Sequence, residues 1–163
     1  TALKKGKAAP KTVKAATASM VALNREASLV MRRHPVHACT DVTGYGPLGH
    51  TLEMASASGV TIVLEAARFP VLEGAVRLAE QGYLTGGCRR NRAYLLDKAS
   101  VAPSVGAGLV EIAFDPQTSG GLLIAIPRAR AEALVDELRA NGVPAATIVG
   151  HAVALEDMPV RLV

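Results

Sequence analysis

Aromatic residues are scarce in this sequence, which has no tryptophan, three tyrosines and two phenylalanines among its 163 residues. A hydrophobic core must therefore be built from the aliphatic residues Ala, Val, Leu and Ile. Proteins that stack single-stranded bases need clustered aromatic side chains, so the scarcity disfavours such a platform. Charged residues make up only 20% of the chain and hydrophobic residues 50%, which excludes an intrinsically disordered protein.

Cysteines and long apolar runs are scarce too. The two cysteines, Cys39 and Cys88, are too few for a disulfide framework and form no C-x-x-C metal pair. We expect both thiols to be buried and inert. No run of roughly 18 apolar residues occurs, so we expect no membrane span and a cytoplasmic protein.

Excess positive charge is confined to the start of the chain. Residues 1–33 hold eight basic and one acidic side chain, a balance of +7, whereas the rest hold ten and thirteen, a balance of −3. The lysines of this segment are Lys4, Lys5, Lys7, Lys11 and Lys14. A solvated chain end is a commoner cause of such a run than phosphate binding, so we expect no nucleic-acid partner.

Hydrophobic periodicity predicts alternating helices and strands. The predicted helices are 12–33, 47–58, 73–81, 91–99 and 128–140, the predicted strands are 36–42, 60–65, 110–114, 122–126 and 147–154, and residues 100–108 and 115–121 are predicted loops. We therefore expect residues 1–163 to form a single α/β (α+β) domain in which helices cover a mixed sheet.

A glycine-rich loop at residues 40–50 lies between a predicted strand and a predicted helix. Gly44, Gly46 and Gly49 match the G-x-G-x-x-G pattern of dinucleotide-binding βαβ units, and Glu65 follows Gly44 by 21 positions. Asp41 argues against that interpretation, because a carboxylate repels a pyrophosphate unless a cation lies between them.

A metal–phosphate site is the alternative at this loop. Asp41 offers a hard oxygen ligand suited to Mg²⁺. The hydroxyl of Thr43 and the backbone amides around Gly44 and Gly46 can hold phosphate oxygens or waters. An aspartate followed by glycines is also common in a plain turn or helix cap, so spacing alone leaves both interpretations open.

A second polar loop, residues 115–121, lies between two apolar segments. Loops at strand ends hold ligands in α/β folds, which makes Gln117, Thr118 and Ser119 candidate ligand residues. Taken alone, the segment is more simply interpreted as a polar turn.

Three motifs occur in an order that resembles the C-terminal domain of the selenophosphate synthetase (selenide, water dikinase) family. They are D-V-T-G-Y-G-P-L-G-H at residues 41–50, G-G-C-R-R-N at 86–91 and D-P-Q-T-S-G-G-L-L at 115–123. Each motif alone is weak, but the three together are specific, and the resemblance covers nearly the whole chain. The wider group is the aminoimidazole-ribonucleotide synthetase superfamily.

The resemblance implies a two-domain enzyme that makes selenophosphate, AMP and phosphate from selenide, ATP and water, for selenocysteine and selenouridine synthesis. In that family the N-terminal domain holds the catalytic Cys or selenocysteine, the essential Lys, most metal-binding aspartates and the dimer interface. The resemblance therefore implies no catalytic residue in this chain, an inactive isolated fragment, an N-terminal domain as partner and a homodimer at full length.

The resemblance also implies roles for individual residues. The family's D-V-T-G aspartate matches Asp41, which would bind Mg²⁺ beside the ATP phosphates, with Thr43, Gly44 and Gly46 around it. Four further residues are candidates without a firm role: Asn91, Gln117, Thr118 and Ser119. We expect His50 to cap or pack the helix that follows.

Two other functions stay open. One is a non-catalytic nucleotide-binding module, and the other is a different ATP-dependent enzyme of the same superfamily.

Overall fold

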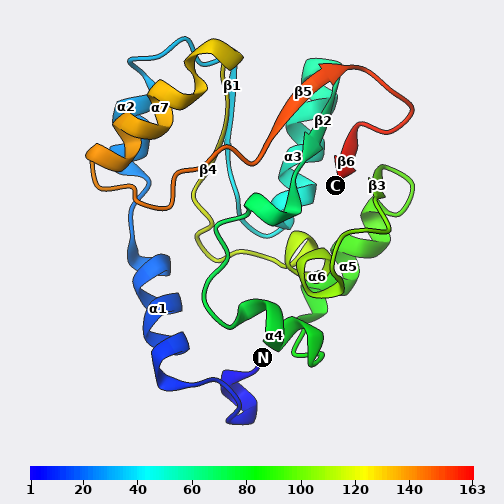
Figure 1. Cartoon of the computed structure of the whole chain (residues 1–163). Coiled ribbons are helices and arrows are strands. Elements are labelled where there is room, and N and C mark those ends of the chain that lie inside the picture. The colour runs from blue at the N-terminus through cyan, green and yellow to red at the C-terminus, as the bar shows by residue number, and fades with distance from the viewer.

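The computed structural model describes residues 1–163, and Figure 1 traces the whole chain. Its elements in chain order are the 3₁₀ helix η1 (Leu3–Lys5), α1 (Pro10–Val21), α2 (Arg25–Met31), β1 (Ala38–Asp41), α3 (Gly46–Ser58), β2 (Val60–Leu64), the 3₁₀ helix η2 (Ala66–Arg68), α4 (Ala75–Glu80), α5 (Gly86–Leu95), β3 (Ala99–Val101), α6 (Ala107–Phe114), β4 (Leu122–Ala125), α7 (Arg128–Ala140), β5 (Gly150–Ala154) and β6 (Val160–Leu162).

Four strands form a mixed sheet in the order β3-β6-β2-β5. Strand β2 pairs antiparallel with β5 and parallel with β6, which in turn pairs parallel with β3. Helix α3 packs against this sheet, with α5 and α6 beside it (Figure 1). The predicted mixed sheet covered by helices is therefore confirmed.

Strands β1 and β4 do not join that sheet. They form a separate antiparallel ribbon in which Ala38 faces Ala125 and Asp41 faces Leu122. Figure 1 shows α2 and α7 beside this ribbon. The prediction of one sheet is thus corrected to a four-stranded sheet and a two-stranded ribbon, because the strand predicted at residues 36–42 pairs only with the one at 122–126.

Two hydrophobic clusters match these two units. Ala27 and Val30 of α2 pack with Leu134 and Leu138 of α7, against partly buried side chains of β4. The larger cluster joins α3, α5 and α6 to the four-stranded sheet and consists of Leu48, Leu52, Met54, Ala55, Ile62, Leu64, Ala66, Cys88, Leu95, Ala113, Phe114, Val160 and Leu162.

The long helix predicted at residues 12–33 is two helices in the structure. The backbone is extended at Ala22, where α1 ends. The two halves have different neighbours, since α1 lines a cavity with α4 whereas α2 packs on α7. A regular apolar stripe could not show that its two halves contact different parts of the fold.

Other predictions were wrong where apolar runs are short. Residues 110–114 form part of helix α6 rather than a strand, and a short apolar run does not distinguish the two. Helix α5 begins at Gly86 instead of residue 91. Strand β3, which spans the end of the helix predicted at 91–99 and the start of the loop predicted at 100–108, and strand β6 were missed because each has three residues.

None of the helices combines the length and the apolar character that a membrane span requires.

Strand β6 is an internal strand of the sheet, and its Leu162 side chain is fully buried. We predict that Leu162→Ala lowers the free energy of unfolding by about 2–5 kcal/mol, because it leaves a cavity in the core. The control is Leu155→Ala, since Leu155 is 62% exposed and should lose less than about 0.5 kcal/mol. Urea unfolding of both variants measures the difference, and equal losses would contradict the central place of β6.

Candidate functional site

The two polar loops identified in the sequence lie side by side. The ribbon of β1 and β4 leads into both, and backbone hydrogen bonds continue the pairing beyond it. The amide of Val42 donates to the Gly121 carbonyl at 3.0 Å, and that of Gly120 donates to the Val42 carbonyl at 2.9 Å. The Gln117 amide donates to the Thr43 carbonyl at 2.9 Å. The candidate residues of both loops therefore belong to one region.

Two glycines allow this close approach. Gly46 has a φ of +70°, and a Cβ there would lie 2.8 Å from the Asp115 carbonyl oxygen. A Cβ at Gly120 would lie 2.6 Å from the Val42 carbonyl oxygen. A side chain at either position would push the loops apart. Gly46 thus contacts the second loop, whereas Gly44 is exposed and has free space beside it.

Asn91 of α5 connects the same loops from the interior. Its side-chain amide donates to the Gly44 carbonyl at 3.0 Å and to the Phe114 carbonyl at 2.9 Å. The residue is only 8% exposed. Both amide hydrogens are occupied by these bonds, so the geometry shows Asn91 holding the loops in register.

The remaining candidates are more accessible. Asp41 lies on the exposed face of β1 together with Cys39. Thr118 is exposed and Ser119 is half-buried. The side-chain amide of Gln117 donates to the Asp115 carbonyl at 3.0 Å, within its own loop. One short segment holds Asp41, Thr43 and Gly44. Its backbone is fixed by the pairing of Asp41 with Leu122 and by the hydrogen bonds that the Thr43 and Gly44 carbonyls accept.

The loop supplies some, but not all, of the oxygen ligands that a hard cation needs. The structure contains no group of three His, Cys, Asp or Glu side chains placed to hold a metal ion. Asp41 supplies one carboxylate, and Mg²⁺ commonly takes one or two protein carboxylates and completes its shell with phosphates and waters. The chemistry of Asp41 therefore fits one ligand position of a Mg²⁺ ion.

Charged groups surround the start of the second loop. Burial raises the pKa of Asp115, and the Thr85 hydroxyl, which donates to its carboxylate at 3.2 Å, opposes that effect. Burial also raises the pKa of the Cys88 thiol to about 11, helped by its hydrogen bond to Glu111. The Arg92 guanidinium pairs with Glu111. These groups hold α5 and α6 together and leave Cys88 protonated.

Cys39 does not match the prediction of a buried thiol. It is exposed, because β1 alternates its side chains and Cys39 lies on the outer face. Partial desolvation by the atoms around it, followed by the charge of the nearby Asp41, raises the pKa of this thiol. Cys88 is buried as predicted, and both cysteines are free.

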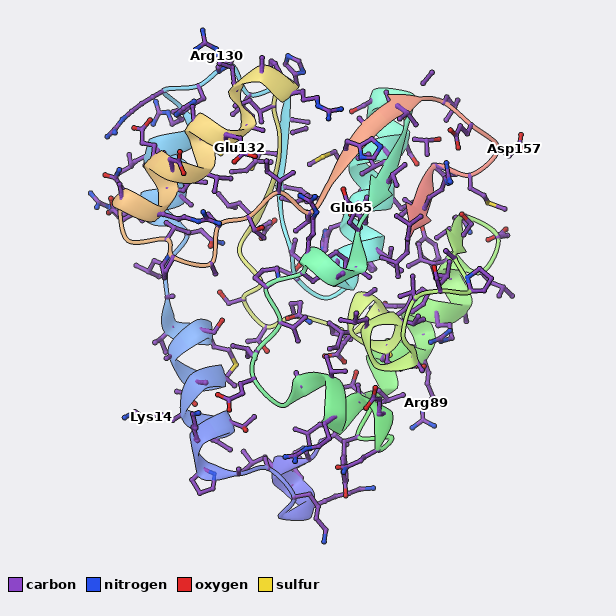
Figure 2. The ribbon with its side chains drawn as sticks, in the orientation of Figure 1. Lys14, Glu65, Arg89, Arg130, Glu132 and Asp157 are labelled. Carbon is purple, nitrogen blue, oxygen red and sulfur yellow. The ribbon has the colours of Figure 1, made fainter.

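The G-x-G-x-x-G interpretation fails on topology. A dinucleotide-binding unit needs two parallel strands joined through a helix, but β1 and β2 belong to different sheets. Glu65, which that interpretation would place on a ribose, pairs with Arg68 at 2.7 Å. Figure 2 labels Glu65 near the middle of the molecule.

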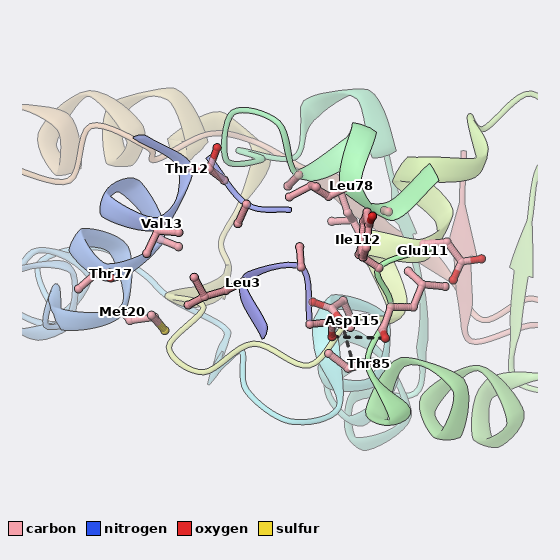
Figure 3. A pocket seen from close by; sticks show the side chains of 18 residues that line it. Leu3, Thr12, Val13, Thr17, Met20, Leu78, Thr85, Glu111, Ile112 and Asp115 are labelled. Atoms are coloured by element: carbon pink, nitrogen blue, oxygen red, sulfur yellow. Dashed lines mark hydrogen bonds between the residues drawn. The ribbon is translucent and has the colours of Figure 1, made fainter. Parts of the chain in front are cut away.

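A cavity of about 360 Å³ lies next to the Asp115 loop (Figure 3). Most of its lining residues are apolar, and they include Val13 and Met20 of α1 and Leu78 of α4. Thr85, Glu111 and Asp115 give it a polar end. Helix α1 buries no residue, and several of its side chains line this cavity.

Sequence reasoning missed two partners near the glycine loop. His50 is 6% exposed, and its ring nitrogens contact the Thr43 hydroxyl and the Glu53 carboxylate. The prediction that His50 packs in the helix is borne out by its burial, but it does not cap α3, whose N-cap residue is Tyr45. A His and a Glu three positions apart share one helix face, and this spacing is the sequence signal that could have indicated the pair.

The chain matches known proteins over nearly its whole length. A family model described as AIR synthase related protein, C-terminal domain, matches residues 2–162. A selenide, water dikinase from Agathobacter rectalis is 41% identical over 155 residues, which cover 95% of this chain and 45% of the relative. Another from Caldanaerobacter subterraneus is 46% identical over 129 residues, which cover 79% of this chain and 37% of the relative.

The chain thus spans less than half the length of these curated relatives. Among solved structures, that of the hydrogenase maturation protein HypE aligns over 80% of this chain and 33% of its own, with 20% identity and a TM-score of 0.46. That similarity is too low to support an argument.

We predict that Asn91→Asp destabilises the protein, because a carboxylate has no hydrogen to donate and would face two carbonyl oxygens. The expected loss is about 2 kcal/mol or more in the free energy of unfolding, measured with urea. Asn141→Asp is the matched control, since the Asn141 amide also donates to a backbone carbonyl but is exposed. Similar losses in both variants would show that Asn91 does not hold the loops.

The raised pKa of Asp115 predicts a pH effect on stability. A carboxyl whose folded pKa lies above its unfolded value favours the folded state at low pH, and this contribution is lost as pH rises through the folded pKa. Asp115→Asn carries no such charge. The variant should therefore gain stability relative to wild type as the pH rises through and above the ordinary pKa of an aspartate, about 4, and a difference in urea unfolding that stays constant with pH would contradict the burial effect.

Proposed function

This chain belongs to the AIR synthase related proteins, of which it is a C-terminal domain, and we propose that it forms the C-terminal part of a selenide, water dikinase. The reaction proposed for the whole protein makes selenophosphate, AMP and phosphate from selenide, ATP and water. The observation that carries the proposal is the exposed Asp41 near Thr43 and Gly44, in a loop that Asn91 holds by a hydrogen bond to the Gly44 carbonyl. The D-P-Q-T-S-G-G sequence at residues 115–121 favours this enzyme over other members of the superfamily.

In this proposal Asp41 supplies one carboxylate ligand to Mg²⁺ at the phosphates of ATP. When bound, the ion neutralises phosphate charge and orients the phosphates. The Asp41 carboxylate is positioned by the β1–β4 pairing, which ends at the pair of Asp41 and Leu122. The exposed backbone at Gly44 leaves room for a phosphate or a water beside it.

The rest of the full-length protein is the first partner we propose. Several apolar side chains around the first two helices are exposed, with Met20 at 44%, Val21 at 69% and Leu23 at 81%. A broad groove of about 1360 Å³ runs from the second loop, at Gln117 and Ser119, past α1 and along β4. An N-terminal domain covering these surfaces would bring further metal ligands to Asp41.

The remaining partners and the location follow from the family. We propose a homodimer for the whole protein and a cytoplasmic location, which suits two unpaired cysteines. The lysines near the chain start are exposed, and Lys11 already pairs with Glu73 at 2.7 Å. Figure 2 shows Lys14 directed away from the body of the protein.

Asp41→Asn in the full-length protein is the direct test. The change keeps the shape of the side chain and removes its charge, so Mg²⁺ should be held less tightly. We predict a loss of selenide-dependent AMP formation on the order of a hundredfold, with a higher Mg²⁺ requirement. The melting temperature should hardly change, because Asp41 is exposed.

The matched control is Asp157→Asn. Asp157 is also exposed, but lies in the turn between β5 and β6, remote from the loops (Figure 2). Wild-type activity and an unchanged Mg²⁺ dependence in Asp41→Asn would remove Asp41 from the site, and a large fall in melting temperature would assign it to a structural turn. Nucleotide binding by the full-length protein without selenide-dependent AMP formation would favour the non-catalytic module.

A further inference from the structure

A hydroxyl, an imidazole and a carboxylate form a chain behind the glycine loop. The Thr43 hydroxyl oxygen lies 3.1 Å from Nε2 of His50, and Nδ1 of His50 lies 3.0 Å from a carboxylate oxygen of Glu53. His50 is 6% exposed, whereas the Glu53 side chain is 56% exposed. The chain therefore runs from the surface of α3, through a buried ring, to the loop that holds Asp41.

The chemistry of the three groups determines the direction of both hydrogen bonds. The Glu53 carboxylate has only acceptor atoms, so Nδ1 of His50 must carry the hydrogen that lies between them. In the neutral ring the other nitrogen, Nε2, is then an acceptor. The partner of Nε2 must therefore donate, and the Thr43 hydroxyl is the only donor in contact with it.

We propose that Glu53 and His50 are positioning residues that turn the proton of the Thr43 hydroxyl inward, so that Thr43 presents only oxygen lone pairs to the ligand. This inference deepens the proposed function and rests on it. A hydroxyl oriented in this way cannot donate to a phosphate oxygen. It accepts instead from a water bound to a divalent cation, or contacts the cation itself.

This assignment changes the role expected for Thr43 from the sequence. A phosphate oxygen needs a hydrogen-bond donor, and the inward proton leaves none on this side chain. Asp41, two residues earlier, is likewise an acceptor. The two side chains together suit a hydrated Mg²⁺ ion, whose waters donate hydrogen bonds outward.

The orientation of the hydrogen bonds is tested by nitrogen NMR of the full-length protein at about pH 8, above the usual pKa of histidine. Histidine rings are labelled with ¹⁵N, and the His50 signals are assigned by their loss in His50→Gln. We expect the hydrogen on Nδ1. In Glu53→Gln the side-chain amide can donate to Nδ1, so a population with the hydrogen on Nε2 should appear. A wild-type ring with its hydrogen on Nε2 would overturn the proposal.

The role of the Thr43 oxygen is tested by the Mg²⁺ dependence of AMP formation. Thr43→Val should raise the Mg²⁺ concentration needed for half-maximal rate on the order of tenfold or more. Thr43→Ser, which keeps the hydroxyl, should need a Mg²⁺ concentration close to that of wild type. At saturating Mg²⁺ the KM for ATP should change little. A raised KM for ATP with an unchanged Mg²⁺ requirement would show that Thr43 binds phosphate, and would overturn the proposal.

The matched control is Thr51→Val on α3, the helix that carries His50 and Glu53. Thr51 is buried, and its hydroxyl donates to the Pro47 carbonyl at 2.7 Å rather than to His50. A shift of the Mg²⁺ requirement in Thr51→Val equal to that in Thr43→Val would assign the effect to general loosening of α3 and contradict the positioning role. If the full-length protein shows no selenide-dependent turnover, the proposed function fails, while the NMR measurement still decides the orientation of His50.

Discussion

The close backbone approach of two loops, residues 42–46 and 115–121, is the constraint on which the rest of the structure depends. A glycine in each loop makes the approach possible. The buried side-chain amide of Asn91 donates to the carbonyls of both Gly44 and Phe114 and so keeps them close together. Helix α3 begins at Gly46 and α6 ends at Phe114, so the same contact places both helices. The position of Asp41 relative to α3 is therefore a consequence of packing between loops.

The sequence predicted correctly those elements whose limits are set by neighbouring residues. Helix α3 was predicted almost to its ends, because Pro47 lies in its first turn and Gly59, with a φ of +63°, ends it. The split between α1 and α2 and the helix at residues 107–114 depend on which distant segments they touch. Asn91 lies 47 residues from Gly44 in the chain, so no local pattern could indicate their hydrogen bond.

The polar residues of the two loops fall into two groups, those that form hydrogen bonds within the chain and those that are exposed to solvent. Asn91 and Gln117 donate their amide hydrogens to backbone carbonyls, and Gly46 is buried against Asp115. Asp41 and Thr118 are exposed. The first group maintains the loops, and the second is free to contact a ligand. In the proposed function the same motifs therefore combine residues that maintain the loops with residues that contact the ligand, and a sequence pattern alone does not separate the two.

The proposed site also accounts for an aspartate in a loop whose glycine pattern resembles that of phosphate-binding loops. Asp41 is an acceptor, and in the proposed orientation Thr43 is another, so together they repel a bare phosphate and attract a cation. An ATP phosphate would then bind here only together with its Mg²⁺ ion. Because Asp41 offers a single carboxylate and no metal-binding cluster exists in this chain, the cation would be held firmly only when further ligands arrive from the rest of the protein. This arrangement would make ion binding depend on assembly of the two parts and would keep the isolated loop from capturing nucleotide on its own.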